Sequence, residues 1–148
     1  MRRQRNKSQK GTAILEFAIS WSVLIALLTG VYQFGYTFYI YNQLMTSVTN
    51  AAELGSKMDY DTQNADAYTT ALKNMVLYGD TTAQAKPIVP GLAAANVNVN
   101  ITVNNSIPQD LTITITGYTV DAVFTTFTFS GKPRATVAYL GHVICSGC

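Results

Sequence analysis

The longest uninterrupted apolar stretch of the chain runs from Phe17 to Tyr36, twenty residues without a charge or a proline. At a rise of about 1.5 Å per residue, a helix of this length crosses the roughly 30 Å hydrocarbon core of a bilayer. The pattern therefore predicts a transmembrane helix, and the tyrosines at its end suit an aromatic belt at the interface.

Beyond this stretch the apolar residues recur at helical spacing instead of filling every position. At 100° per residue they fall within about 80° of one another, which predicts that the same helix continues as an amphipathic rod. We expect one helix over residues 12–56, starting at Thr12 and closed near Gly55 as a C-cap. The residues of the predicted apolar stripe are Phe34, Phe38, Tyr41, Met45, Val48 and Ala52.

A second, shorter helix is predicted in "DYDTQNADAYTTALKNMVLYGD", capped by Asp61 or Thr62 and ended by Gly79. Its expected apolar stripe consists of Ala65, Tyr68, Leu72, Met75 and Val76. The segment 81–95 that follows is a connector, because Pro87 and Pro90 interrupt regular structure.

The rest of the chain alternates apolar and polar residues with a period of two, which is typical of half-buried strands. Four such segments are "NVNVNITVN", "LTITITG", "YTVDAVFTTFTFSG" and "RATVAYLGHVI". Turns are expected in "NNSIPQD" and "SGKPR". The sequence thus predicts an α+β fold with an antiparallel sheet of about four strands, covered on its apolar face by the amphipathic half of the long helix.

Charge is distributed unevenly along the chain. Five of the ten basic residues precede Gly11, and all eight acidic residues follow it, so residues 12–148 carry 5 − 8 = −3. A basic N-terminus before an apolar span predicts that the N-terminus is cytoplasmic and that residues 57–148 form an extracytoplasmic head. The scattered cations of the head argue against nucleic-acid binding. A cleaved signal peptide is the competing interpretation, but the apolar run is longer than usual and no small-x-small cleavage site follows it.

Glu16 is the only charge between Lys10 and Glu53. One interpretation is that its carboxylate reaches back to the headgroups and has no further role. The other starts from a cut after Gly11, which would create an α-amine at Thr12. In a staggered bundle of helices that ammonium can pair with Glu16 of a neighbouring subunit, and such a pair sets axial register more than it adds stability.

The motif "GTAILEF" and the longer block through "FGY", "FYIY" and "AAELG" resemble the TadE-like pseudopilins of the tight-adherence (Tad, or Flp) pilus, within the type IV pilin-like superfamily. The resemblance implies that residues 1–11 are a leader removed by a prepilin peptidase between Gly11 and Thr12. It also implies that Thr12, Glu16 and Phe17 guide assembly. Thr12 stands where type IV pilins proper usually carry a methylated Phe, which favours the Tad branch.

The same resemblance implies partners and a location. The partners are other copies or related pilin subunits, the peptidase, and an inner-membrane assembly platform driven by a separate ATPase. The protein would lie in the inner (cytoplasmic) membrane as a single-pass protein before assembly, and afterwards in an extracellular pilus or a periplasmic pseudopilus.

The C-terminal "HVICSGC" places His142, Cys145 and Cys148 three residues apart. A Cys145–Cys148 disulfide is the simplest interpretation outside the cytoplasm, with free or intersubunit thiols and metal binding as alternatives. We expect no resident metal, because a structural zinc needs four ligands and the chain has no further His or Cys. Asp59, Asp61 and Asp66 suit helix capping better than calcium binding.

Neither a nucleophile constellation nor a phosphate-binding loop is evident, so neither an enzyme nor a cofactor is expected. The sequence favours a pilin-like structural subunit that acts in a filament, in secretion or in cell adhesion. The alternative is an uncleaved, single-span membrane protein whose external head binds a partner.

Overall fold

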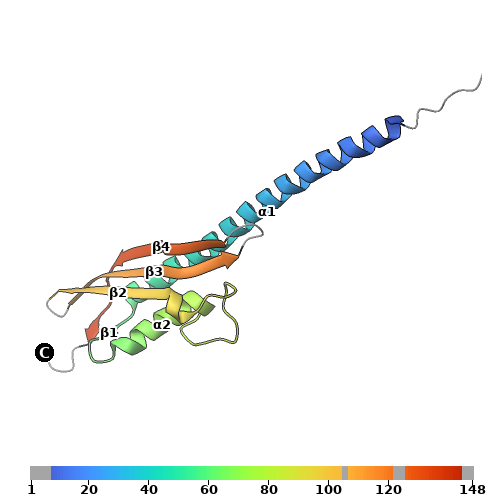
Figure 1. The fold of residues 1–148 in the computed structure, drawn as a ribbon. Coiled ribbons are helices and arrows are strands. Elements are labelled where there is room, and N and C mark those ends of the chain that lie inside the picture. The colour runs from blue at the N-terminus through green and yellow to red at the C-terminus, as the bar shows by residue number, and fades with distance from the viewer. Residues whose placement is uncertain (1–7, 105–106, 122–125, 145–148) are drawn as a thin grey trace, which may run out of the picture. The chain divides into compact units, whose positions relative to one another are not determined.

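The computed structural model describes residues 8–104, 107–121 and 126–144. The chain divides into two compact units, residues 1–36 and residues 37–148, and we call the second unit the head. Helix α1 (Ser8–Lys57) begins in the first unit and contributes its C-terminal part to the head (Figure 1). The expected long helix is therefore present, although it begins at Ser8 and not at Thr12.

The face that α1 buries in the head differs from the predicted stripe. Its buried apolar residues are Ile40, Leu44, Val48, Ala51 and Ala52. The buried face is rotated by about 70° from the predicted one at 100° per residue. Phe34 and Phe38 remain 73% and 67% exposed, whereas Ser47, which is not part of the predicted stripe, is only 6% exposed.

Gly55 does not end α1, because the helix continues to Lys57. It is instead a point of close packing. A Cβ atom at this position would lie 2.5 Å from Leu111 Cδ2 and 2.8 Å from Leu72 Cδ2. The Tyr68 hydroxyl donates a hydrogen bond of 2.5 Å to the Gly55 carbonyl. Glycine is needed here because two other elements approach the helix backbone.

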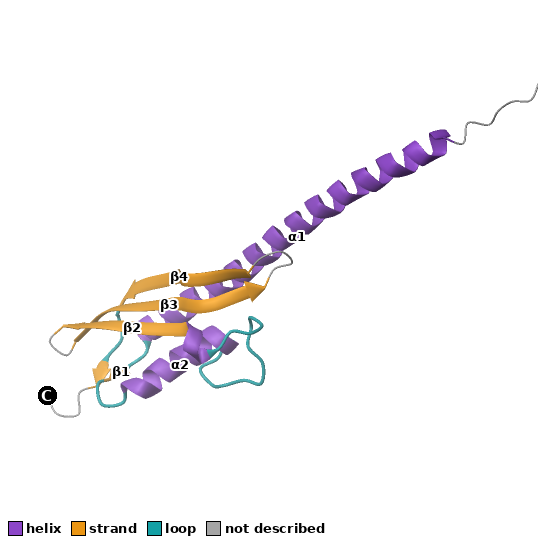
Figure 2. Ribbon diagram, in the orientation of Figure 1, coloured by secondary structure: helices purple, strands orange, loops and turns teal. Residues whose placement is uncertain are grey.

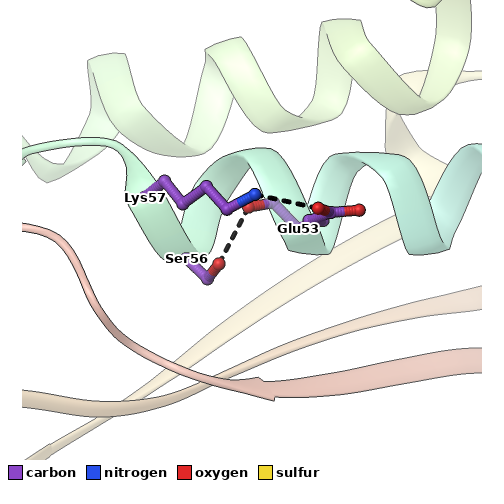
Figure 3. A network of polar contacts seen from close by, with 3 residues as sticks. All are labelled: Glu53, Ser56 and Lys57. Atoms are coloured by element: carbon purple, nitrogen blue, oxygen red, sulfur yellow. Dashed lines mark hydrogen bonds and ion pairs between the residues drawn. The ribbon is translucent and has the colours of Figure 1, made fainter.

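The last turn of α1 carries a small polar network of Glu53, Ser56 and Lys57, in which the two charged side chains are exposed and Ser56 is buried (Figure 3). The Lys57 ammonium donates to Glu53 Oε1 at 2.8 Å, and the Ser56 hydroxyl donates to the Glu53 carbonyl at 2.8 Å. The ammonium of Lys57 holds the pKa of the Glu53 carboxyl below its ordinary value, first through this hydrogen bond and then through its charge. Lys57 also complements the negative end of the helix dipole, as expected.

Helix α2 (Ala65–Tyr78) ends as predicted at Gly79, which has φ 73° and donates its N–H to the Met75 carbonyl at 3.0 Å. It buries Tyr68, Leu72, Val76 and Leu77. Its start differs from the prediction, because Asn64 occupies the N-cap without a side-chain capping bond. The Asp61 carboxylate accepts instead from the Gln63 N–H at 2.9 Å, in the turn before the helix.

The head contains one antiparallel sheet of three strands in the order β2 (Val97–Asn104), β3 (Ile107–Asp121) and β4 (Thr126–Ala138), as Figure 2 shows. The short 3-10 helix η1 (Ala94–Asn96) precedes β2. Strands β1 (Tyr60–Asp61) and β5 (Val143–Ile144) form a separate parallel pair. The α+β prediction is confirmed, whereas the main sheet has three strands and not about four.

Two positions where one predicted strand ended, at Gly117 and at "SGKPR", lie inside strands of the structure. Strand β3 continues through Gly117, with irregular pairing on either side of Thr116. Strand β4 runs through "SGKPR", where a turn was predicted, and the expected fourth strand is divided between β4 and β5. Proline is tolerated at edge strands and bulges, and β4 is an edge strand. The predicted "NNSIPQD" turn was also too long, since β3 already begins at Ile107.

The core of the head lies between the C-terminal part of α1, α2 and the apolar face of β3. Leu111, Ile113 and Ile115 are fully buried, which confirms the alternation predicted for "LTITITG". On β2 the burial fades along the strand, from Val97 at 2% exposed to Val103 at 46%. The predicted cover of the sheet by α1 is therefore correct in its elements and incorrect in the phase of the helix.

The segment after β4 forms hydrogen bonds with the end of α1 and the residues that follow it. The Leu140 N–H donates to the Ser56 carbonyl at 2.7 Å, and the Tyr139 hydroxyl donates to the Met58 carbonyl at 2.7 Å. The Tyr60 N–H donates to the His142 carbonyl at 2.9 Å. His142 is exposed, and Cys145 and Cys148, with the predicted disulfide, lie outside the described residues.

Candidate functional site: the exposed N-terminal part of the long helix

The part of α1 in the first unit exposes large apolar side chains on nearly every side. They are 46–73% exposed, and at 100° per residue they leave no gap wider than about 80°. These residues are Ile14, Leu15, Phe17, Ile19, Trp21, Val23, Leu24, Ile25, Leu27, Leu28, Val31, Tyr32 and Phe34. A helix that is apolar all round needs an apolar environment on every side.

The remaining sector of this helix, which carries none of these large apolar side chains, is not a polar face. It is occupied by Ala18, Ser22 and Thr29. The Ser22 hydroxyl donates to the Ala18 carbonyl at 2.9 Å, and the Thr29 hydroxyl donates to the Ile25 carbonyl at 2.8 Å. Both hydroxyl protons are thus satisfied by the backbone of the helix itself. Among the described residues, this is the one helix long and apolar enough to cross a membrane.

The residues of the predicted processing site lie at the start of this helix. Gly11 and Thr12 are in its first turns, and a Cβ atom added to Gly11 would meet nothing within 4 Å. Glu16 is exposed four residues after Thr12. A spacing of four residues places Thr12 and Glu16 on one face of the helix, one turn apart.

Phe17 lies about 100° around the helix from Glu16, and its ring stacks on that of Trp21 with the ring centroids 5.9 Å apart. Its side chain is 66% exposed. The structure thus brings Thr12 and Glu16 to one face and places Phe17 on the adjoining one. The predicted roles of Gly11, Thr12, Glu16 and Phe17 in processing and assembly remain predictions.

A cluster of tyrosines in the head was not singled out from the sequence. Tyr60 contacts the Tyr68 ring edge-on at a centroid distance of 5.4 Å and the Tyr139 ring at 6.5 Å. Burial raises the pKa of the Tyr68 phenol, and nearby Tyr139 and Tyr60 raise it further. Burial also raises the pKa of Tyr139. Both phenols donate to backbone carbonyls, so the cluster closes the distal end of the core and has no obvious chemical role.

A second feature that sequence reasoning missed is a basic hollow in the head. It is lined by Tyr41 and Met45 of α1 and by Gly131, Lys132 and Arg134 of β4. No local sequence pattern indicated this hollow, because the predicted turn at "SGKPR" separated these cations from the helix. In the part of the chain that the structure describes, no group of three or more His, Cys, Asp or Glu side chains is placed to hold a metal ion.

Comparison with known proteins finds a match for the N-terminal region only. The family model described as TadE-like protein matches residues 11–53, which include the apolar helix, Glu16 and the first part of the head. No curated protein and no solved structure gave a significant match to the chain. The matched segment, residues 11–53, is less than a third of the chain, and this segment is similar to the TadE-like proteins.

Proposed function

We propose that this protein is a pilin-like structural subunit, processed by a prepilin peptidase after Gly11 and assembled through α1 into a Tad or type IV-like pilus or pseudopilus. The observation that carries the proposal is the all-round exposure of apolar side chains on α1 next to a single carboxylate, Glu16. This helix suits two apolar environments in turn, the bilayer before assembly and a bundle of identical helices afterwards.

The bundle needs a device that selects one axial offset, since apolar helices alone slide against one another. A carboxylate near the hydrocarbon region costs about 2.5–3.5 kcal/mol at the bilayer centre and less near the interface. Cleavage after Gly11 creates an ammonium at Thr12, because an α-amine has a pKa of about 8. Pairing of that ammonium with Glu16 of the adjoining subunit relieves the cost of both charges in one register only.

In this proposal the protein begins as a single-pass subunit of the inner (cytoplasmic) membrane, with its N-terminus in the cytoplasm and the head outside. Its partners are other pilin subunits, the prepilin peptidase and an assembly platform with a separate ATPase. The five basic residues before Gly11 support this orientation, because the first cation after the apolar span is Lys57. The protein performs no catalysis in this scheme.

Intact mass spectrometry of the protein isolated from its native membrane tests the processing step. We expect a polypeptide that begins at Thr12. A chain that retains residues 1–11 in both membrane and sheared filament fractions would instead support an uncleaved membrane anchor with an external binding head.

Substitution of Glu16 tests the assembly step. We expect Glu16→Gln to be processed and inserted normally but to enter sheared filaments at least tenfold less efficiently, since the partner of the Thr12 ammonium is lost. Glu16→Asp keeps the charge and should be affected less. Glu53→Gln, a carboxylate removed from the same helix outside the apolar region, is the matched control and should assemble normally. Normal incorporation of Glu16→Gln would remove the role assigned to this residue.

A further inference from the structure

The basic hollow in the head, defined above by Tyr41, Met45, Gly131, Lys132 and Arg134, has a volume of about 340 Å³. The ring of Tyr41 contacts Phe129 of β4 at a centroid distance of 5.9 Å, so the strand lies directly beside this part of α1 (Figure 1). The hollow is therefore built from the first turns of α1 within the head and from one edge strand of the sheet.

None of the described residues compensates the charge of this hollow. Lys132 and Arg134 are both exposed, and neither takes part in an ion pair with any of the described residues. No acidic side chain is among the described residues that line the hollow. Pro133 between them is fully buried, whereas the side chains on either side of it are both exposed. Two adjacent, unpaired cations favour an anionic ligand.

The position of the hollow along α1 indicates which anion is available. Tyr41 lies five residues after Tyr36, where the predicted span ends, which corresponds to about 8 Å of helix. Exposed aromatic residues continue in between, with Phe38 at 67% and Tyr39 at 58%. The polar headgroup layer occupies about 5–8 Å on each side of the hydrocarbon core. With residues 17–36 in a bilayer, a group at Tyr41 would therefore lie at the depth of the lipid phosphates.

We propose that the basic hollow binds the headgroup of an anionic phospholipid in the outer leaflet of the membrane that α1 crosses, before the subunit is assembled. The Arg134 guanidinium offers a planar fork and the Lys132 ammonium a compact charge to the phosphodiester oxygens. Tyr41 and Met45 supply an apolar side for the glycerol and the upper acyl chain. These cations lie some ninety residues after the span, too far along the chain to influence its orientation.

The contact would hold the head against the membrane surface and would have to be released when the subunit leaves the bilayer. This inference rests on the membrane insertion of α1 in the proposed function, but not on cleavage after Gly11 or on filament assembly. Co-elution of the protein with nanodiscs tests the insertion separately. Failure to co-elute would contradict the proposed function, whereas insertion without a headgroup contact would contradict the inference alone.

The experiment compares full-length protein in nanodiscs of phosphatidylcholine with nanodiscs that contain one-third phosphatidylglycerol. The rate at which an amine-reactive ester acetylates Lys132 is followed by peptide mass spectrometry. We expect the anionic lipid to slow this reaction about fivefold, the factor that corresponds to one cation held at an anionic surface. Lys86, which is exposed on the connector between α2 and η1, is the internal control and should react equally in both discs.

Further measurements of the Lys132 acetylation rate identify the source of the anion and test whether Arg134 takes part in binding it. Sodium chloride at 1 M should abolish the protection of Lys132, because it shortens the Debye length to about 3 Å. Inorganic phosphate added to phosphatidylcholine discs should leave the rate unchanged, and equal slowing by phosphate would replace the lipid by a free anion. Arg134→Gln should reduce the protection, and Lys86→Gln should not. Equal rates for Lys132 in both discs, or equal slowing of Lys86, would overturn the proposal.

Discussion

Gly55 provides the most exacting test of how the head is packed. In an exposed helix interior, Gly→Ala would stabilise the protein by about 1 kcal/mol through helix propensity. At Gly55, however, the added Cβ would lie 2.5 Å from Leu111 Cδ2 and 2.8 and 2.9 Å from the two Leu72 methyl groups. Both leucines are fully buried, so their methyl groups have no free space to enter.

Overpacking of a filled core costs about 1–3 kcal/mol, which exceeds the propensity gain over most of this range. We therefore expect Gly55→Ala to destabilise the head by about 1 kcal/mol and to lower its Tm by about 4 °C. Leu111→Val removes the methyl group closest to the new Cβ and suits a strand, so the penalty of Gly55→Ala should become smaller in that background.

The assay is thermal unfolding of the full chain in detergent micelles, followed by near-ultraviolet circular dichroism of the head tyrosines. Each single variant and the double variant are measured, so that the coupling between positions 55 and 111 is obtained from a complete cycle. A higher Tm for Gly55→Ala, or a penalty that is the same with Leu and with Val at position 111, would refute the close-packing argument.

Three further predictions concern the end of α1 and the tyrosines beside it. Tyr68→Phe removes the hydrogen bond to the buried Gly55 carbonyl and should cost about 1–3 kcal/mol, measured by the same unfolding assay. Burial raises the pKa of Tyr68 and Tyr139 in the folded head, so their contribution to stability is complete below about pH 10 and declines as the pH rises further. We therefore expect Tm to fall between pH 8 and pH 11. That fall should be smaller in Tyr68→Phe, and an equal fall would contradict this assignment. Glu53→Gln should leave Tm unchanged, because both partners of the Glu53–Lys57 pair are more than 60% exposed, and a clear decrease would show that the pair stabilises the helix end.

The predictions from periodicity were correct where one face of an element is buried and the other is exposed to solvent. The alternation in "LTITITG" and the burial of Tyr68, Leu72 and Val76 on α2 were predicted on this basis, and both are present. The predicted phase of α1 in the head was wrong because the apolar residues Phe34 and Phe38 were included in the stripe, although both side chains are exposed in the structure. The predicted stripe began in an exposed part of α1 and continued into the part that is buried in the head, so its spacing combined the patterns of two different surroundings.

The glycines and prolines misled the prediction for a different reason. Both residue types are typical of turns and caps, and this led to a helix end at Gly55 and a turn at "SGKPR". In the structure Gly55 admits Leu72 and Leu111, and Pro133 is buried in an edge strand. These roles depend on contacts between residues far apart in sequence, which local patterns do not contain.

The hydrogen bonds that join Tyr139 and Leu140 to Met58 and Ser56 at the end of α1 have a consequence for folding during synthesis. Leu44 and Val48 leave the ribosome some sixty residues before Leu111 and Ile113 arrive to cover them, and the contacts of Tyr139 and Leu140 form later still. A polypeptide that stops short of Tyr139 would therefore contain the strand that covers α1 but would lack the hydrogen bonds that hold the end of this helix.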